Sequence, residues 1–473
     1  MKKTVQTNCY STSYKKTDCN IGVVHLGFGA FHRAHQAVYF DDLMEKSGVL
    51  NCGIAAVNLK GGDSKKFARV AEIKNGYLLK TVAPDGRQNY RLVRPHLSYV
   101  DWPERPREAE NLFSLPEVQA VTITITESGY SLNSDHSLNL DDSAIVHELK
   151  GGQCTTIYGF LANALAQRAE KTDAPISILC CDNIRENGTM LARNLNTYLQ
   201  ATKQLALAQW VSDNVAFPNS MVDRITPRAN PALEGEIQTL FPGQNLQPIH
   251  AEEFCQWVIE DSFNGAMPDL GHVGVEIVPD ANPYEEAKIR ILNGGHTGLT
   301  YLGALAGYKT FDQAMADDML RNHFDAWENQ EVLPGLDISL PFDKSHYLDV
   351  ITARFKNQAI ADQLERICVD GYTKMSIYIR PTLAGCLQHG ITPYNGYNCV
   401  ASWIVFSRRW AEGKISFTYH EPYWGQLQPL LAEGKEEEVA QSAQLWGELP
   451  EKYKDFVPDM VTAIKEMEKK WPA

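Results

Sequence analysis

Residues 21–27 (IGVVHLG) form a short apolar run that ends in glycine, and the pattern behind it predicts a helix through about Met44. Such a run is typical of a strand buried on both faces of a parallel sheet. Similar runs lie at 53–59, 77–83, 119–126 and 175–181, with helical stretches such as Thr155–Lys171 between them. Strands that alternate with helices predict an α/β fold with a Rossmann-like, doubly wound parallel sheet.

The pattern changes after about residue 280. The segments 285–308, 311–331, 348–369 and 432–446 predict helices, and strand candidates become scarce. We therefore expect a Rossmann-like domain at 1–282 and a mainly α-helical domain at 283–473. No Gly/Ser linker separates them, so we expect close packing and a substrate cleft between the domains. Residues 1–20 are polar and are expected to form a loose arm.

Charge and composition restrict the partners of the chain. Its 44 Lys and Arg against 58 Asp and Glu give a net charge of −14, which disfavours binding to nucleic acids and to anionic membranes. No run of about 18 apolar residues predicts a membrane span, and the polar N-terminus does not read as a signal peptide. Ten cysteines without a C-x-x-C pair are typical of reduced, buried thiols. We expect a cytoplasmic protein.

The loop after the first strand carries a glycine motif. Gly27 and Gly29 permit a tight turn and close approach of a pyrophosphate to the backbone at the start of the helix. His32 stands where the third glycine of G-x-G-x-x-G would be, so an ordinary strand–helix turn remains the alternative. His32 and Arg33 are either cationic phosphate contacts or exposed surface residues. The predicted cofactor contacts of this loop are Gly27, Phe28, Gly29, Ala30, Phe31, His32 and Arg33.

The loop after the second strand should meet the adenosine ribose. An acidic residue there favours NAD, because it binds the ribose hydroxyls. Asp63 is the nearby carboxylate, and Lys60 is an alternative partner for the 2′-phosphate of NADP. Asp63 favours NAD, with a plain solvated loop residue as the alternative.

Two further strands end in polar residues. Glu127 follows the strand at 119–126 and is a predicted cofactor contact, and Asn183 follows the strand at 175–181. Ligands of such sheets bind beyond the carboxyl ends of the strands. The Asn183 amide can donate to a developing alkoxide; the alternative is a turn or helix-cap residue.

The segment 283–296 carries a possible catalytic face. At about 100° per residue, Glu285, Lys288, Asn293 and His296 share an arc of roughly 140°. A lysine among apolar neighbours can lose its charge near neutral pH and serve as a general base. The alternative is a surface lysine beside an interior histidine. Gly294-Gly295 indicates either a helix break or a close backbone approach. No metal-ligand pattern is present, so we expect no metal.

Five ordered blocks resemble the polyol-specific long-chain dehydrogenases/reductases, the mannitol dehydrogenase family. The blocks are 27–36 (GFGAFHRAHQ), 181–183 (CDN), 217–227 (FPNSMVDRITP), 256–261 (QWVIED) and 283–296 (PYEEAKIRILNGGH). The resemblance covers nearly the whole chain and implies metal-free catalysis by a lysine. At Gly295 the chain departs from the pattern, because relatives often carry serine there.

The resemblance also implies roles for single residues. Lys288 matches the catalytic lysine, and Glu285 the acidic residue beside it. Asn183 and Asn293 match the asparagines that hold the oxyanion. The implied substrate contacts are His296, Asp223, Arg366 and Lys374.

Within the family, 126–133 (TESGYSLN), 154–159 (CTTIYG), 223–228 (DRITPR), 283–293 and 370–374 (DGYTK) are similar to the members that act on D-arabinitol. The expected activity is the reversible, NAD-dependent oxidation of D-arabinitol to D-xylulose. The alternatives are a mannitol 2-dehydrogenase or fructuronate reductase activity and, in another class, a non-catalytic dinucleotide sensor.

Overall fold

The computed structural model describes residues 9–73, 75–133, 135–227 and 231–471. The chain divides into two compact units. The first comprises residues 1–83 and 87–282, and the second comprises residues 84–86 and 283–473.

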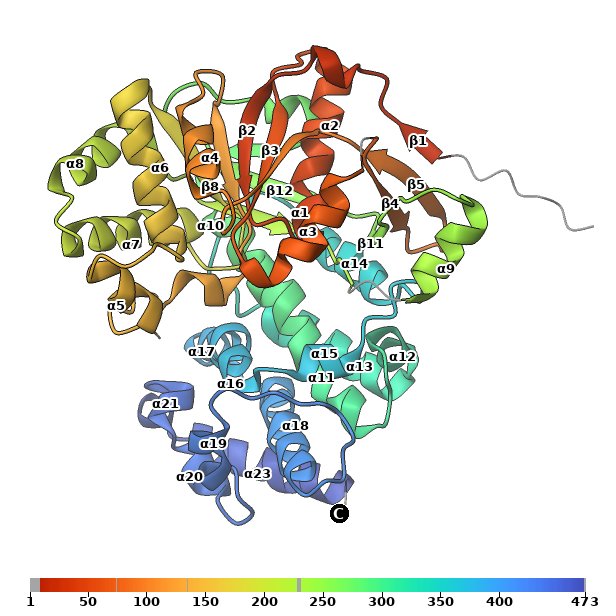
Figure 1. Ribbon diagram of the computed structural model, residues 1–473. Helices are drawn as coiled ribbons and strands as arrows, with labels where there is room; N and C mark the ends of the chain where they lie inside the picture. The colour runs from red at the N-terminus through yellow and green to blue at the C-terminus, as the bar shows by residue number, and fades with distance from the viewer. Residues whose placement is uncertain (1–8, 74, 134, 228–230, 472–473) are drawn as a thin grey trace, which may run out of the picture. The chain divides into compact units, whose positions relative to one another are not determined.

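A six-stranded sheet forms the centre of the first unit (Figure 1). Its strands are β2 (Ile21–Leu26), β3 (Gly53–Asn58), β6 (His96–Asp101), β7 (Ala120–Ile123), β8 (Ile176–Cys180) and β9 (Val215–Ala216). They lie in the order β6-β3-β2-β7-β8-β9, and every pair is parallel. This is the Rossmann strand order, in which the direction of winding reverses between β2 and β7. The predicted fold class is confirmed.

Helices cover both faces of this sheet, because each strand sends alternate apolar side chains to opposite sides. Val24 and Leu26 of β2 join one core with α4 and α6, whereas Val23 joins the core formed with α2. Figure 1 shows α4 and α6 on one side of the strands and α1 to α3 on the other. The helices of this unit are α1 (Ala30–Ala34), α2 (Gln36–Ser47), α3 (Ser64–Ala71), α4 (Pro106–Asn111), α5 (Ser143–Leu149), α6 (Ile157–Lys171), α7 (Asn187–Ala201), α8 (Leu205–Asn214) and α9 (Pro231–Leu240).

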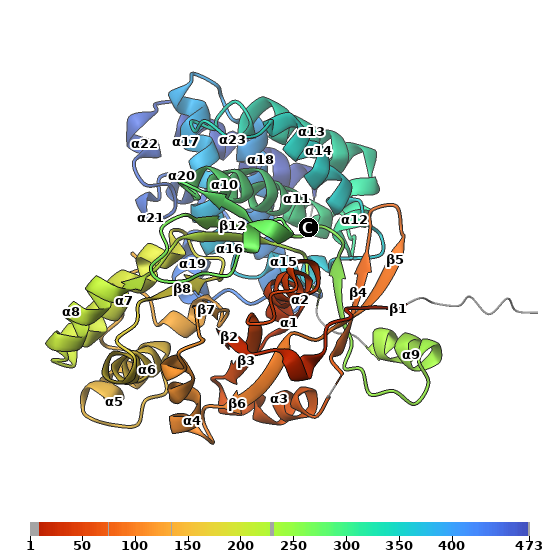
Figure 2. The same cartoon turned by 90° about the horizontal axis from the view of Figure 1, so that it is seen from above.

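The run at 77–83 is a strand, but it does not belong to the central sheet. It forms β4 (Tyr77–Val82), which pairs with β5 (Gln88–Val93) and β11 (Ile249–Glu252) in a separate four-stranded sheet. Figure 2 shows these strands beside α9, whose Leu233 and Ile237 pack on Leu78. The third strand of the parallel sheet is instead β6, whose sequence HLSYVD lacks a continuous apolar run. A third sheet consists of β10 (Ser220–Asp223), β12 (Gln256–Glu260) and β13 (Glu276–Val278).

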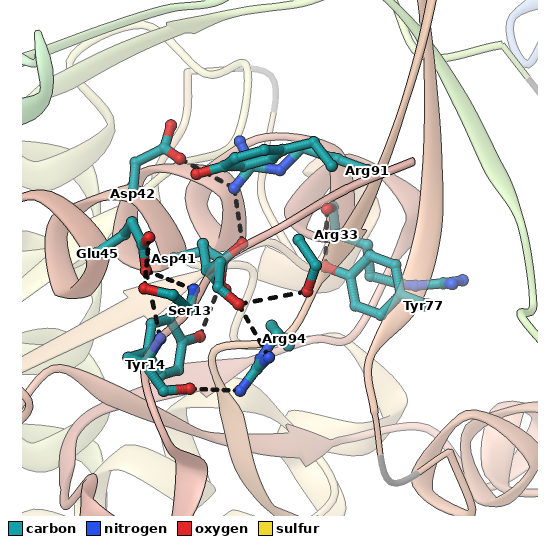
Figure 3. A network of polar contacts seen from close by, with 12 residues as sticks. Ser13, Tyr14, Arg33, Asp41, Asp42, Glu45, Tyr77, Arg91 and Arg94 are labelled. Atoms are coloured by element: carbon teal, nitrogen blue, oxygen red, sulfur yellow. Dashed lines mark hydrogen bonds and ion pairs between the residues drawn. The ribbon is translucent and has the colours of Figure 1, made fainter. Parts of the chain in front are cut away.

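The N-terminal arm is bound rather than loose over residues 9–20, so that expectation is wrong for this part. Strand β1 (Cys9–Ser11) pairs with β5. Tyr14 is buried, and its hydroxyl donates to Asp41 over 2.6 Å. Figure 3 shows Arg91 paired with the same aspartate, at 2.6 Å. The Tyr14 phenol thus holds the arm on α2, and the ion pair holds β5, the partner of β1, on the same helix. Residues 1–8 lie outside the described residues.

The second unit is helical, as predicted. Its elements are α10 (Asn282–Ala287), the π-helix η6 (Lys288–Asn293), α11 (Gly294–Leu305), α12 (Phe311–Ala316), α13 (Asp318–Trp327), the π-helix η7 (Glu328–Val332), α14 (Lys344–Phe355), α15 (Leu364–Cys368), α16 (Gly371–Lys374), the π-helix η8 (Met375–Ile379), α17 (Arg380–Gln388), α18 (Tyr394–Ala411), α19 (Trp424–Leu430), α20 (Glu436–Ala440), α21 (Ala443–Trp446), α22 (Leu449–Lys452) and α23 (Phe456–Lys470). One apolar core runs through it, with Trp327, Trp403 and Trp446 fully buried. The predicted helix at 348–369 is interrupted between α14 and α15, and α18 and α23 were not predicted.

Candidate active site

The glycine loop after β2 is tightly constrained at Gly27. Its φ of +92° is a conformation that side-chain-bearing residues rarely adopt. A Cβ at this position would also lie 2.1 Å from the carbonyl oxygen of Thr124. At Gly29 a Cβ would meet nothing within 4 Å, so the space beside this residue is open. Position 27 therefore requires glycine, and Gly29 leaves room for a ligand against the backbone.

The residues after the glycines begin a helix that is soon interrupted. Ala30 starts α1, which ends before His35, where φ is −120° and ψ is −91°. The Phe28 ring packs edge-on against Phe67 and His96, and the Phe31 ring stacks on His35. Phe28 and Phe31 thus secure the shape of the loop through aromatic contacts.

His32 and Arg33 are buried, so the expectation that they are surface residues is wrong. His32 stacks on His25 with ring centroids 3.3 Å apart, and its Nε2 lies 2.9 Å from Nε2 of His96. Burial lowers the pKa of His32 well below its usual range. Burial thus disfavours the charged ring, and with it a cationic contact from His32 to phosphate. The Arg33 guanidinium donates to the carbonyl oxygen of Gln247 over 2.6 Å and lies over the Tyr77 ring.

The carboxyl end of β3 carries Asn58, which sequence reasoning did not single out. Its amide donates to Asp101 over 2.8 Å and to the carbonyl oxygen of Lys60 over 2.9 Å. Lys60 and Asp63 follow it, and both are exposed. Asp63 ends the 3-10 helix η2 (Gly61–Asp63).

A cavity of about 530 Å³ lies beside this loop. The residues that line it include Leu59, Lys60 and Gly61 after β3, Pro106 and Glu110 of α4, and Asn163 of α6. It therefore opens at the carboxyl edge of the parallel sheet, where nucleotides bind in this type of fold.

Three predicted residues stand at other strand ends of the first unit. Glu127 follows β7 and Asn183 follows β8, and both are exposed. Asn183 lies in a bend before α7 and does not cap that helix, which begins after Glu186. Asp223 ends β10 and is only 4% exposed.

In the second unit, Lys288 is 8% exposed, so the alternative of a surface lysine is wrong. It begins the π-helix η6, which ends at Asn293. A π-helix has wider turns than an α-helix, so the angular positions predicted at 100° per residue do not apply over this stretch. Single π-helical turns are frequent at functional sites. The Asn293 side-chain nitrogen is buried and has no hydrogen-bond partner among the described residues.

The predicted substrate contacts of the second unit gather around Asp362, which the sequence did not indicate. Nε2 of His296 lies 3.9 Å from its carboxylate, and Arg366 donates to it from Nε over 2.9 Å and from a terminal nitrogen. Burial lowers the pKa of His296 to about 3. Burial also lowers the pKa of Lys374 to about 8, and its ammonium nitrogen donates to the carbonyl oxygen of Ile367. The structure thus brings His296, Arg366 and Lys374 to one place.

Two family profiles match the chain in tandem. The mannitol dehydrogenase Rossmann domain matches residues 21–272, and the mannitol dehydrogenase C-terminal domain matches residues 280–468. The chain belongs to the mannitol dehydrogenase family. The resemblance drawn from the sequence is therefore confirmed.

Members of the mannitol dehydrogenase family with different named substrates are similar to this chain. A D-arabinitol 4-dehydrogenase of Klebsiella pneumoniae is 34% identical over 84% of this chain and 87% of its own. The structure of the Pseudomonas fluorescens mannitol 2-dehydrogenase in ternary complex with NAD and D-mannitol matches with a TM-score of 0.85 and 30% identity, over 97% of this chain and 94% of that one. The substrate-free structure of a D-sorbitol dehydrogenase matches with a TM-score of 0.88 and 28% identity, over 98% and 96%.

Two properties of this family member concern metals and membranes. Within the described ranges, no group of three or more His, Cys, Asp and Glu residues is arranged to hold a metal ion. No helix in the described part of the chain is long and apolar enough to cross a membrane.

Proposed function

We propose that the chain is an NAD-dependent polyol dehydrogenase that oxidises D-arabinitol to D-xylulose, reversibly and with Lys288 as general base. The observation that carries this proposal is the side-chain nitrogen of Asn293, at the end of the helix that Lys288 begins, which is buried and has no hydrogen-bond partner among the described residues. A buried amide left unpaired costs free energy. A substrate oxygen is the partner that this donor lacks, and the family is one of polyol dehydrogenases.

We assign the steps of the reaction to different residues of the chain. NAD, when bound, would supply the acceptor for the hydride of the carbinol carbon. The Lys288 amine, when neutral, takes the proton of the hydroxyl group, and Glu285 passes that proton to solvent. Asn183 and Asn293 donate hydrogen bonds to the oxygen as negative charge develops on it. Positioned amide donors of this kind typically contribute about 10²–10³-fold to kcat.

Substitution of Lys288 is the decisive test. General base catalysis contributes roughly 10²–10⁴-fold, so Lys288→Ala should lower kcat by at least about that factor while NADH affinity stays unchanged. Lys288→Met keeps most of the side-chain volume and should be equally inactive. Lys356→Ala, which removes an exposed lysine of the same unit, is the matched control and should leave kcat unchanged. If Lys288→Ala retains more than about a tenth of kcat, the base is another residue, with Glu285 or His296 next in line.

Substrate choice is tested with a panel of D-arabinitol, D-mannitol and D-sorbitol, which are oxidised with NAD, and of D-xylulose and D-fructuronate, which are reduced with NADH. Arg366 is already paired with Asp362 through two hydrogen bonds, so its charge is balanced before any substrate binds. This pairing favours a neutral polyol over a uronate, whose carboxylate would depend on Lys374, the other candidate cation, whose charge is disfavoured by burial. We expect the highest kcat/KM among the polyols for D-arabinitol, and a kcat/KM for D-fructuronate at least about tenfold below that for D-xylulose, the loss that corresponds to one charge-assisted hydrogen bond. A preference for D-mannitol over D-arabinitol, or for D-fructuronate over D-xylulose, contradicts this assignment.

The cofactor is NAD rather than NADP, supported by Asp63 in the exposed loop after β3. A carboxylate at this point favours the free ribose hydroxyls of NAD and repels a 2′-phosphate. The contrary indication is Lys60 in the same loop. Catalytic efficiency measured with both cofactors at one polyol concentration should be higher with NAD, and the reverse order contradicts the assignment.

A non-catalytic dinucleotide sensor is the alternative from another class. Such a protein needs the loop at Gly27–Gly29 but has no use for a buried lysine and an unpaired amide in one helical segment. NADH binding without turnover of any polyol or ketose in the panel would favour the sensor.

A further inference from the structure

Thr126 has a backbone conformation that is rare for any residue with a side chain. Its φ is +70° and its ψ is 155°, a region populated almost only by glycine. Residues held in such regions persist only where the surrounding structure enforces them, and they cluster at functional sites. Thr126 is exposed and lies directly before Glu127.

Asp182 enforces this conformation from the next strand. It follows β8, which lies beside β7 in the sheet (Figure 2). One carboxylate oxygen accepts the backbone N–H of Ile125 over 2.9 Å, and the other accepts the backbone N–H of Thr126 over 3.0 Å. The Tyr130 hydroxyl donates to the first oxygen over 2.6 Å. Three donors from the segment after β7 thus converge on one carboxylate.

Asp182 is itself held in place through its backbone. The Asn187 side chain donates to the carbonyl oxygen of Asp182 over 3.0 Å and to that of Ser220 over 2.8 Å. Asn187 is only 1% exposed. Asp182 and the buried Asn187 thus form a clamp, which joins the ends of β7 and β8 to the interior of the unit. Asn183 follows Asp182 directly in the chain.

The clamped segment borders the point where the winding of the sheet reverses, between β2 and β7. Ligands of open α/β sheets bind at this point. The Thr124 hydroxyl donates to the carbonyl oxygen of Gly27 over 3.0 Å, so the segment after β7 also contacts the glycine loop. Residues 124–127 and the glycine loop are the two sides of the predicted dinucleotide site.

We propose that Asp182 is a positioning residue, whose carboxylate holds Thr126 in its strained conformation and so fixes Glu127 and Asn183 for the nicotinamide half of NAD. The proposal rests on the proposed function, because it takes NAD as the ligand. The Asp182 side chain contacts the segment after β7 rather than the cofactor. Its effect reaches the cofactor through the ends of β7 and β8.

The test measures the Kd for NADH by fluorescence in the full-length protein, together with the melting temperature. Asp182→Asn keeps the size of the side chain but sets an amide donor against a backbone N–H. We expect Kd to rise by about tenfold or more, the loss that corresponds to one charge-assisted hydrogen bond. Thr126→Gly is measured as the parent of a double variant, because glycine adopts a positive φ freely and needs no carboxylate to hold it there.

The double variant separates positioning from general loss of structure. With glycine at 126 the bound conformation carries no strain, so Thr126→Gly combined with Asp182→Asn should recover about threefold or more of the affinity lost in Asp182→Asn alone. The matched control is Asp173→Asn. Asp173 is exposed, precedes β8 and also has a positive φ. Its carboxylate accepts the Trp210 indole N–H over 2.7 Å. The Kd of this control variant should equal that of the wild type.

Two outcomes overturn the proposal: an unchanged Kd in Asp182→Asn, or a double variant that binds no better than Asp182→Asn. If Asp182→Asn does not melt cooperatively, Tyr130→Phe takes its place, with an expected rise of about threefold for one lost hydrogen bond, reversed by Thr126→Gly. An unchanged Kd in Tyr130→Phe then overturns the proposal. The assay contains no polyol, so a wrong substrate assignment does not affect it, whereas a wild-type protein that fails to bind NADH contradicts the cofactor assignment and this inference together.

Discussion

At the scale of single residues, burial controls the charges around Asp362. The carboxylate is 8% exposed and pairs with Arg366. His296 and Lys374 lie in its field, yet burial lowers the pKa of both. A buried imidazole that stays neutral near pH 7 can hold a substrate hydroxyl without adding a charge. The imidazole is thus suited to an uncharged, polar ligand, whereas Lys374, with a pKa of about 8, is still mainly protonated at pH 7.

Lys374 should make the stability of the protein depend on pH. Its pKa is about 8 in the folded state against an ordinary 10.5. Between these two values the unfolded chain binds more protons, so the free energy of unfolding gains up to about 1.4 kcal/mol per pH unit from this group as pH rises. Below pH 8 both states are protonated, and the cost of burying the charge is constant.

The variant Lys374→Met isolates this effect. It carries no titrating group at 374, so the difference in melting temperature, wild type minus variant, should increase from pH 8 to pH 10. The difference should be flat between pH 6 and pH 7.5. If the melting temperatures of the two proteins differ by the same amount from pH 6 to pH 10, Lys374 has an ordinary pKa.

Sequence patterns indicated several candidate site residues but not their partners. Lys288, Asn293 and His296 stood out because polar groups recur within an apolar helical segment. Asp362 and Asp182 were not assigned roles, because their significance depends on contacts with chain segments that sequence spacing does not report. The burial of His32 was not predicted for the same reason: it depends on His25 and His96, which come from two strands.

At the scale of elements, the strands show which patterns are informative. The strands β2, β3 and β8 were predicted because strands buried on both faces are continuous apolar runs, and β7 because β-branched residues alternate along it. The run that forms β4 was equally clear as a strand, but its assignment to another sheet depends on β11, about 170 residues further along the chain. The π-helix η6 was not predicted, because it differs from an α-helix only in its hydrogen-bond pairing.

Gly295 illustrates how closely the helices of the second unit pack. Of the two predicted alternatives, a close approach to the glycine backbone is present and a helix break is not. α11 begins at Gly294 directly after η6, so the helix continues through Gly294-Gly295. A Cβ at position 295 would lie 2.2 Å from Oε1 of Glu328. Glu328 is fully buried, and its carboxylate oxygens have no hydrogen-bond partner among the described residues. Burial raises its pKa well above the usual range, so this carboxyl is neutral.

Relatives often carry serine at position 295. In this chain, serine there should be tolerated only if the side chain at position 328 is smaller. Gly295→Ser should destabilise the protein by about 1–3 kcal/mol through overpacking. The double variant with Glu328→Ala should be less destabilised than the sum of the two single variants by about 0.5–3 kcal/mol. Urea unfolding of the four proteins measures this coupling, and simple additivity would mean that Glu328 moves aside without cost.

At the scale of the whole molecule, the class of protein followed from the order of its elements. Alternating strands and helices predicted the Rossmann-like unit, and the loss of strands after residue 280 predicted the helical one. The two family profiles match in the same order, at 21–272 and 280–468. The substrate did not follow in this way, because relatives named for D-arabinitol and mannitol share the whole architecture. A few side chains in the site decide among such substrates.

Removal of metal ions tests the proposed chemistry as a whole. In metal-dependent alcohol oxidation a bound cation polarises the oxygen and lowers the pKa of the hydroxyl group. Here Lys288 is proposed to take the proton, and the amides of Asn183 and Asn293 to stabilise the oxygen, so no cation is required. Dialysis against EDTA should therefore leave the rate of polyol oxidation unchanged, and added Zn²⁺ or Mn²⁺ should not raise it. Loss of activity in EDTA that either metal restores would mean that Lys288 is not the group that activates the alcohol, and the search for ligands would begin with the acidic and histidine side chains nearest to it, Glu285 and His296.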